Sequence, residues 1–504
     1  MPPSSSRSEV TDFAAVRAEL SLPAMRDSAR FPSDVQAEAA RAAEQHGFSG
    51  REDATGLPLV TIDPPGAMDL DQAMLLRRRP RGGYTVHYAI ADLPAFVRAG
   101  GPLDQETRRR GQTLYLPDAP VPLHPPVLSS GAASLLPDQV RPAALWTIEL
   151  DGDGEPIDAR VRRALVRSVA RLNYAGVQAD LNAGRAHPSI EVLPELGRLR
   201  RALAVARGAV ELELPEQEIV PDGANWRIVL RKRTEVDAWN AEISLLTGMC
   251  AAQLMLQAKM GLLRTLPEPD DAAIAELRRR ARSLGVQWGD GETPARVLSA
   301  LDPGEPAALA VFTEASRLLR GAGYVGFDGA APSHNWHTGI GAPYAHVTAP
   351  LRRLVDRYGA EVCLAVCAGT AVPEWTRSAL PLLPEVMASS DRRAAQMERA
   401  CLDQVEAWLL APRVGQDFDA IVLRSDGRGG GYGRDDKNGR DDKNGRGAEV
   451  FIADPPTLAR CMGEDLVEGS RVTVRLAEAD PTARKVVFGA QPSPSQPSSS
   501  PSKE

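Results

Sequence analysis

Three carboxylates fall within nine residues early in the chain, at Asp63, Asp69 and Asp71. They follow a short apolar run, residues 59–62, that predicts a buried strand, and Pro64-Pro65-Gly66 then predicts a turn. A strand followed by a tight turn can bring the carboxylates to one point, where they repel one another unless a cation binds among them. Oxygen ligands of this kind suit Mg²⁺ or Mn²⁺ rather than zinc, and such sites are typical of phosphate-ester chemistry. Because aspartate is also common in turns, a purely structural role is the alternative.

A second block that could act on phosphate spans residues 344–356 and reads Tyr-Ala-His-Val-Thr-Ala-Pro-Leu-Arg-Arg-Leu-Val-Asp. Pro350 predicts the first turn of a helix, where its missing N–H is no loss. Arg352 and Arg353 would then lie at a helix N-terminus, where free N–H groups favour an anion. A guanidinium in this place can stabilise negative charge on phosphate oxygens. The alternative is an exposed arginine pair on a helix.

Both blocks resemble the signatures of the ribonuclease II family, which are processive 3′-to-5′ exoribonucleases. The first block matches as Thr-Ile-Asp, five residues, then Asp-x-Asp, and the second resembles Tyr-x-x-Phe-Thr-Ser-Pro-Ile-Arg-Arg-Tyr-x-Asp. Supporting blocks follow in the same order between residues 110 and 137, so the resemblance covers residues 51 to about 490. The family's strand and turn have four aspartates, and the fourth position here is Gln72. Glutamine offers a metal only a neutral carbonyl oxygen.

The resemblance implies a role for each matching residue. Arg352 would stabilise charge on the scissile phosphate, and Asp71 would be the other catalytic residue. The metal would be held by Asp63, Asp69, Asp71 and Gln72. Single-stranded RNA would be bound by Tyr115, Tyr174, Glu242 and Arg353. For the tyrosines the alternative is a core position with a satisfied hydroxyl, and for Glu242 it is a solvated helix surface.

Other departures from the family pattern concern the grip on the RNA 3′ end. The family's opposing aromatic jaw falls in the stretch equivalent to residues 207–216, which contains no aromatic residue. Ala241 replaces the first glutamate of a Glu-Glu pair, and Gly248 replaces an asparagine in the next turn. We therefore expect a looser grip, or one built from another residue.

Residues 1–50 are predicted to form a small helical segment. One helix is expected over Asp12–Leu20, and a capping box at Ser33–Gln36 predicts a second that Gly47 closes. Family members usually have two cold-shock barrels in this position, and 50 residues cannot hold two. The helices are either part of a helix-turn-helix unit or a simple packing cap.

The last part of the chain turns from helix to strand. A long helix over Glu385–Leu410 is expected to close a catalytic domain of residues 51–412. Short strands then predict an S1-like OB barrel over residues 413–490; they are expected at 415–423, 449–452, 469–476 and 485–489. Residues 427–447 are Gly-rich, charged and low in complexity, which predicts a disordered loop, and the Ser- and Pro-rich residues 491–504 predict a disordered tail.

Composition adds weaker constraints. The chain has 504 residues, a hydrophobic fraction of 43% and no apolar run long enough to span a membrane. The net charge of −7 argues, by itself, against nucleic-acid binding, although clusters of arginine occur and Arg pairs well with phosphate. Five cysteines without metal-type spacing and a start without a signal-peptide core favour a reducing cytoplasm. We expect a monomer.

The sequence therefore predicts an α+β protein with a mixed-sheet catalytic domain and a small C-terminal β-barrel. The predicted function is a Mg²⁺-dependent 3′-to-5′ exoribonuclease that releases nucleoside 5′-monophosphates, with the 2′-hydroxyl selecting RNA. One alternative is a catalytically weakened RNA-binding member, because the fourth metal-site position is Gln72. Another is a DNA-directed nuclease, which rests only on the N-terminal helices.

Overall fold

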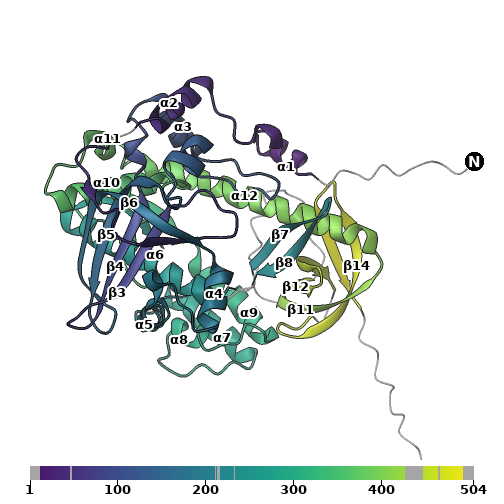
Figure 1. Ribbon diagram of the computed structural model, residues 1–504. Helices are drawn as coiled ribbons and strands as arrows, with labels where there is room; N and C mark the ends of the chain where they lie inside the picture. The colour runs from purple at the N-terminus through teal and green to yellow at the C-terminus, as the bar shows by residue number, and fades with distance from the viewer. Residues whose placement is uncertain are drawn as a thin grey trace, which may run out of the picture.

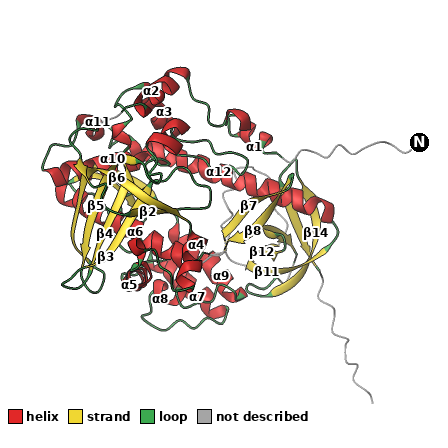
Figure 2. Ribbon diagram, in the orientation of Figure 1, coloured by secondary structure: helices red, strands yellow, loops and turns green. Residues whose placement is uncertain are grey.

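The computed structural model describes residues 12–45, 48–210, 212, 216–231, 233–425, 447–463 and 466–491. A curled sheet with helices on both faces forms the larger part of the molecule, and a small closed β-barrel forms another (Figures 1 and 2). This arrangement confirms the predicted α+β class with a C-terminal barrel. Within the described residues, no helix is long and apolar enough to cross a lipid bilayer.

The six strands of the sheet lie in the order β1-β6-β2-β3-β4-β5. The long strand β6 pairs with β5 along its first part and with β2 along its last part, so the sheet closes on itself. The predicted strand over residues 59–62 is confirmed as β2. The bounds are β1 (Glu52–Asp53), β2 (Leu59–Ile62), β3 (Gln72–Arg78), β4 (Tyr84–Ala91), β5 (Val140–Leu150) and β6 (Pro156–Leu172).

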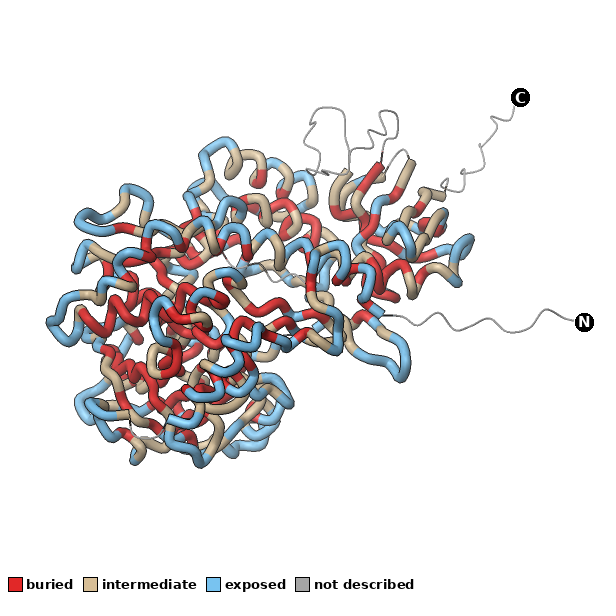
Figure 3. The backbone as a smooth tube through the Cα atoms, turned by 90° about the horizontal axis from the view of Figure 1, so that it is seen from above, coloured by how far each residue is buried: buried red, intermediate tan, exposed pale blue. Residues whose placement is uncertain are grey.

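Strand β3 is buried on both faces, which explains its run of four apolar residues. Ala73 and Leu75 pack with helices α2 (Ser33–Ala43) and α3 (Pro102–Arg110). Met74 and Leu76, which point the other way, pack with the layer that contains α6 and α10. The sheet is thus the middle layer of a sandwich, with exposed residues confined mainly to outer turns and helix surfaces (Figure 3). The two helices of the second layer are α6 (Glu235–Ala258) and α10 (Leu354–Ala368).

The longest helix, α12 (Leu383–Leu410), confirms the helix predicted over residues 385–410. It runs from the sheet to the barrel (Figure 1) and contacts α10 near one end and strands β14 and β15 near the other. It therefore connects the two parts mechanically. The remaining helices are α4 (Tyr174–Asn182), α5 (Leu193–Ala206), α7 (Asp271–Ser283), α8 (Pro294–Leu298), α9 (Pro306–Ala315) and α11 (Glu374–Arg377).

The N-terminal segment folds back onto the body of the protein. Helix α1 (Ala14–Glu19) lies within the predicted range, and α2 begins at Ser33 as expected. The predicted capping box is wrong, because Ser33 is already helical, Pro32 is the N-cap, and the Gln36 amide donates to the Phe31 carbonyl instead. Phe13 packs edge-on against Trp226 and Trp408. These contacts make the segment a packing cap. The predicted closing residue, Gly47, lies outside the described residues.

The barrel has five strands, closed in the order β11-β12-β13-β15-β14. Four of them match the predicted strands, while β13 was not predicted. Most of the predicted disordered loop and tail lies outside the described residues, but Gly447 opens β12 and Gln491 donates its amide to Asp417. The bounds are β11 (Asp417–Ser425), β12 (Gly447–Ala453), β13 (Pro456–Met462), β14 (Arg471–Asp480) and β15 (Lys485–Ala490).

Two antiparallel two-stranded sheets are also present. One is a hairpin of strands β7 (Glu216–Asp222) and β8 (Asn225–Arg231), which lies between α12 and the barrel. The other pairs β9 (Met260–Thr265) with β10 (Gly323–Asp328), which follows helices α7 to α9 in the chain; β9 packs against α6 and α10, and β10 packs against α12. The barrel is held on a second side by α9, where Leu309 packs against Ile421 and Leu423.

Candidate active site

The aspartates occupy the turn between β2 and β3. Gly66 has φ +85°, a conformation that glycine adopts without strain, so the chain reverses directly after Pro64-Pro65. The Asp63 N–H donates to the Leu172 carbonyl at the end of β6 (3.2 Å). Further along, Ser134 Oγ accepts from Leu70 N–H (2.9 Å) and donates to the Met68 carbonyl (2.6 Å). Backbone hydrogen bonds therefore fix the turn at both ends.

The arginine block forms a loop, residues 348–353, that leads into α10. The predicted helix start at Pro350 is wrong, because α10 begins at Leu354 and Arg353 is its N-cap residue. The loop is held by tertiary contacts: Asp356 Oδ1 accepts from Ala349 N–H (2.7 Å), and the Arg352 carbonyl accepts from Thr113 N–H (2.9 Å). The Leu351 side chain is buried in the core that contains residues of helices α2 and α3. The Arg352 side chain is half exposed.

The two blocks meet at Asp71. Its Oδ1 accepts from Leu351 N–H at 2.7 Å, and its Oδ2 lies 3.8 Å from Arg352 Nε. Asp69 belongs to the same centre, because its Oδ2 accepts a hydrogen bond from the Tyr115 hydroxyl at 3.2 Å. The structure thus brings together the catalytic pair that the motifs predict, although Asp71 and Leu351 are 280 residues apart in sequence.

Burial gives this centre unusual electrostatics. Burial, followed by the nearby charge of Asp69, raises the pKa of Asp63 to about 6, against opposing effects of Arg352 and Arg171. Burial also raises the pKa of Asp71 well above its usual range, although Arg352 and the Leu351 N–H favour its charged form. Within the described part of the chain, Asp63 Oδ2 is a buried oxygen without a hydrogen-bond partner. Such an oxygen is costly unless a proton or a cation satisfies it.

The donor set fits a hard divalent cation that also binds phosphate. Across the described ranges, no three His, Cys, Asp or Glu side chains lie close enough to hold a metal by themselves. The side chains therefore do not form the closed acidic cluster that the sequence predicts. Mg²⁺, however, usually takes one or two carboxylates and completes its shell with water and substrate phosphate. The unpartnered oxygen of Asp63 and the neighbouring carboxylates of Asp69 and Asp71 suit that mode of binding.

Gln72, the predicted fourth metal ligand, makes a different contact. Its Nε2 donates to the Thr348 carbonyl at 2.5 Å, which ties the start of β3 to the start of the arginine loop. Its Oε1 and its second amide hydrogen are left for other partners.

The four predicted RNA-binding residues differ in their surroundings: the two tyrosines lie near the aspartates, whereas Glu242 is buried in a helix and Arg353 is paired with Asp356. Tyr115 is 52% exposed and Tyr174 is half-buried, and both lie close to the aspartates. The pKa of Tyr174 is raised to about 12 by burial and then by the charge of Asp63. Glu242 is buried in α6, close enough to Arg207 to affect its pKa. Arg353 directs Nε and one terminal nitrogen onto the carboxylate of Asp356, so its guanidinium stabilises the loop.

Some residues at the centre were missed by the sequence reasoning. His124 is buried, and its Nδ1 is 3.0 Å from the Leu351 carbonyl, so it supports the loop from below. Arg171 lies near enough to Asp63 to lower its pKa and donates to the Ala67 carbonyl. It lies near the end of β6, which runs parallel to β2, so it is beside the aspartate turn that follows β2.

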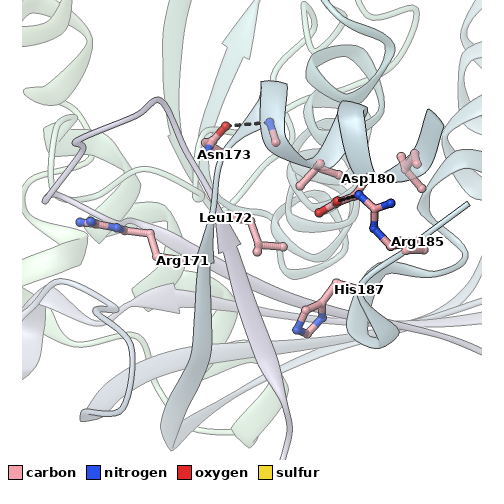
Figure 4. Close-up of a pocket in the computed structure, with 10 residues that line it drawn as sticks. Arg171, Leu172, Asn173, Asp180, Arg185 and His187 are labelled. Carbon is pink, nitrogen blue, oxygen red and sulfur yellow. Dashed lines mark hydrogen bonds and ion pairs between the residues drawn. The ribbon is translucent and has the colours of Figure 1, made fainter. Parts of the chain in front are cut away.

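Two pockets adjoin the centre. One, of about 330 Å³, includes Tyr115, Arg352 and residues Ala394, Met397 and Glu398 of α12. The other, of about 370 Å³, lies between the end of β6 and one face of α4, and Arg171, Asn173 and His187 contribute to its lining (Figure 4). In Figure 4 the Arg171 side chain points away from Asp180 and Arg185, which pair with each other.

The described structure combines two features that define its class of protein. A partly buried acidic centre faces an arginine on a sheet-and-helix domain, and a five-stranded barrel is attached to that domain by one long helix.

Comparison with known proteins identifies the family. The family model for the RNB domain matches residues 51–365, and the model for the RNase II-type exonuclease C-terminal S1 domain matches residues 416–491. The first match covers well over half of the chain, so the protein belongs to the RNB-domain family of RNase II/R type.

Individual relatives are distant. Ribonuclease R of Escherichia coli (strain K12) is 28% identical over 408 residues, which are 76% of this chain and 49% of that protein. The chain thus spans about half the length of the curated relatives it matches. The apo structure of Mycoplasma genitalium RNase R has a TM-score of 0.80 at 19% identity and covers 95% of this chain and 77% of its own. Yeast Ssd1, described as a pseudonuclease, has a TM-score of 0.66 at 18% identity, over 85% of this chain and 53% of its own. At these identities the structures show the fold alone.

Proposed function

We propose that this protein is a divalent-metal-dependent, hydrolytic 3′-to-5′ exoribonuclease that acts on single-stranded RNA and releases nucleoside 5′-monophosphates. The observation that carries the proposal is the meeting of Asp71 with the arginine loop, through the Leu351 N–H and the Arg352 guanidinium. A buried carboxylate facing a half-exposed guanidinium is the pairing that phosphodiester hydrolysis needs. Membership of the RNB-domain family supports the same reaction class.

The residues have separate tasks in this mechanism. Arg352 binds non-bridging oxygens of the scissile phosphate and stabilises the charge that develops on them. Tyr115 stacks on a base and so helps to place the phosphate. Asp71, held by the Leu351 N–H, accepts the proton of the attacking water.

Asp63, Asp69 and Asp71 would hold Mg²⁺, or Mn²⁺ in its place. The bound ion would supply Lewis acidity and a water of lowered pKa at the phosphate. Substrate binding is supported by the RNase R of Mycoplasma genitalium, which has also been solved with ribose-methylated single-stranded RNA. The protein is expected to act as a monomer in the cytoplasm.

The test compares an internally labelled RNA that has a single-stranded 3′ tail with its DNA counterpart, in Mg²⁺ and in EDTA. We expect monophosphate release from RNA only, and none in EDTA. Arg352→Ala should lower the single-turnover rate by about 10²- to 10³-fold, as for removal of one preorganised electrostatic donor. Arg377→Ala is the matched control, because Arg377 pairs with Asp328 on the surface. Equal cleavage of DNA would contradict the proposal.

The second candidate is a non-catalytic RNA-binding member of the family. It is favoured by Gln72, whose amide is engaged with Thr348 rather than offered as a carboxylate. Tight RNA binding with no monophosphate release in Mg²⁺ or Mn²⁺ would support this candidate instead.

A further inference from the structure

Two consecutive residues, Asp71 and Gln72, both form hydrogen bonds with the arginine loop, residues 348–353. Asp71 accepts from the N–H of Leu351, and Gln72 donates to the carbonyl of Thr348. The two contacts lie on either side of Ala349-Pro350, and Arg352 follows directly. Neighbouring strand residues normally point to opposite faces. Asp71 and Gln72 can both contact the loop because the chain only enters strand β3 at Gln72, its first residue.

The Thr348 contact requires a donor. A backbone carbonyl only accepts hydrogen bonds, so the Gln72 amide nitrogen must be the group that faces it. An aspartate or glutamate at this position would place a negatively charged acceptor against the carbonyl oxygen. It would also add a negative charge beside the buried carboxylate of Asp71.

We propose that Gln72 is a positioning residue, which fixes the arginine loop at Thr348 and so presets the Arg352 guanidinium toward Asp71. The proposal rests on the proposed function, since it concerns the same site. In this role Gln72 is an uncharged residue whose hydrogen bond links the start of β3 to the arginine loop, and it is not a weakened metal ligand. Arg352 is half exposed on a long side chain, so the backbone of its loop largely determines where it can reach.

The variant Gln72→Met tests this role, because methionine has similar length but neither donates nor carries charge. It is measured alone and combined with Arg352→Ala, by RNA affinity in EDTA and by single-turnover cleavage in Mg²⁺. We expect Gln72→Met to weaken RNA binding by about 3- to 10-fold when Arg352 is present. In the Arg352→Ala background we expect less than about a 2-fold effect, because the group being positioned is gone.

The matched control is Gln105→Met. Gln105 also donates its amide to a backbone carbonyl, that of Gly100, but on the exposed surface of α3 away from the centre. It should change neither affinity nor rate. If Gln72→Met does not fold, Gln72→Leu gives the same comparison, because leucine also neither donates nor carries charge.

The metal-ligand alternative predicts different results. If Gln72 acted as a ligand, Gln72→Met would raise the Mg²⁺ concentration for half-maximal rate and leave RNA affinity in EDTA unchanged. Gln72→Asp would then increase the rate, whereas we expect a decrease. Either result, or additive effects of Gln72→Met and Arg352→Ala, overturns the proposal.

The outcomes also separate this inference from the proposed function. A wild-type protein that releases no monophosphate contradicts the proposed function, and the affinity cycle in EDTA still tests the role of Gln72. A wild-type protein that cleaves RNA but shows additive affinity effects contradicts only the inference. An affinity that does not depend on Arg352 contradicts the positioning role directly.

Discussion

At the residue scale, Tyr115 combines two groups with separable effects. Its ring is exposed beside Arg352, and its hydroxyl donates to Asp69. Base–aromatic stacking is worth about 1–3 kcal/mol per base, so Tyr115→Ala should raise the Kd for single-stranded RNA by about 5- to 150-fold. Tyr115→Phe keeps the ring and should bind RNA within about 2-fold of wild type.

Fluorescence anisotropy with a short labelled RNA in EDTA measures both variants without the cleavage reaction. Equal losses for Tyr115→Ala and Tyr115→Phe would show that the hydroxyl, not the ring, makes the contact. In that case the stacking role is wrong and the ring only supports the turn that holds Asp69.

The parts of the candidate site that short motifs determine could be predicted from the sequence. The contacts between residues far apart in the chain could not. The spacing of Asp63, Asp69 and Asp71 and the arginine block indicated the meeting of Asp71 with Arg352, which the structure shows. The contact of Gln72 could not be predicted, because its partner lies 276 residues further along the chain. Arg353 was placed with RNA by resemblance, yet Asp356, three residues on, takes up its donors.

At the element scale, similar reasons separate the correct predictions from the wrong ones. Helix α12 and strand β2 have strong apolar patterns and were predicted within a few residues. Strand β13 was missed because the side chains it directs into the barrel are small, namely Thr457, Ala459 and Cys461, while Leu458 is exposed. Alternation of small residues with an exposed leucine gives almost no strand signal.

Helix α1 is too short to be stable alone and depends on a buried ion pair. Arg17, 2% exposed, forms a two-point contact with Asp118, 6% exposed, and donates to the Pro23 carbonyl. Removal of one partner leaves an uncompensated buried charge, so Arg17→Met should lower the free energy of unfolding by about 3–5 kcal/mol. Urea unfolding followed by tryptophan fluorescence measures this, because Trp226 and Trp408 pack on Phe13.

The double variant Arg17→Met/Asp118→Leu is the control for that experiment. Replacing both charges with apolar groups removes the penalty, so most of the lost stability should return. A double variant as unstable as Arg17→Met would show that packing of the arginine stem, rather than charge, holds the segment in place.

At the scale of the whole molecule, the barrel meets the rest of the protein around Glu406 on α12. Glu406 Oε1 accepts hydrogen bonds from the Gln217 amide of β7 (2.9 Å) and from Leu458 N–H of β13 (3.3 Å). The same Gln217 amide also donates to the Pro456 carbonyl. One buried carboxyl therefore links the long helix, the hairpin and the barrel.

This junction makes the stability of the protein depend on pH. Burial raises the pKa of Glu406 from 4.5 to about 7; nearby Asp403 acts in the same direction, while Gln217 and Arg399 oppose it. Between these values the folded protein holds a proton that the unfolded chain has released. The stabilisation is therefore complete below about pH 4.5 and is lost as pH rises through about 7. A shift of this size corresponds to at most about 3 kcal/mol.

Glu406→Gln keeps an acceptor oxygen but cannot ionise. It therefore distinguishes the effect of the carboxylate charge on stability from the effect of the hydrogen bonds. Urea midpoints measured from pH 5 to pH 8 should fall for the wild type relative to the variant, and at pH 8 the variant should be more stable by about 1–3 kcal/mol. Near pH 5 the two should approach each other, because the wild-type carboxyl is then protonated in the folded state.

Glu385→Gln, in the exposed first turn of the same helix, should follow the wild type throughout. A wild type and a Glu406→Gln variant that run parallel across this range would mean that the carboxyl is already ionised in the folded protein, and that the junction is held by the helix and hairpin packing alone.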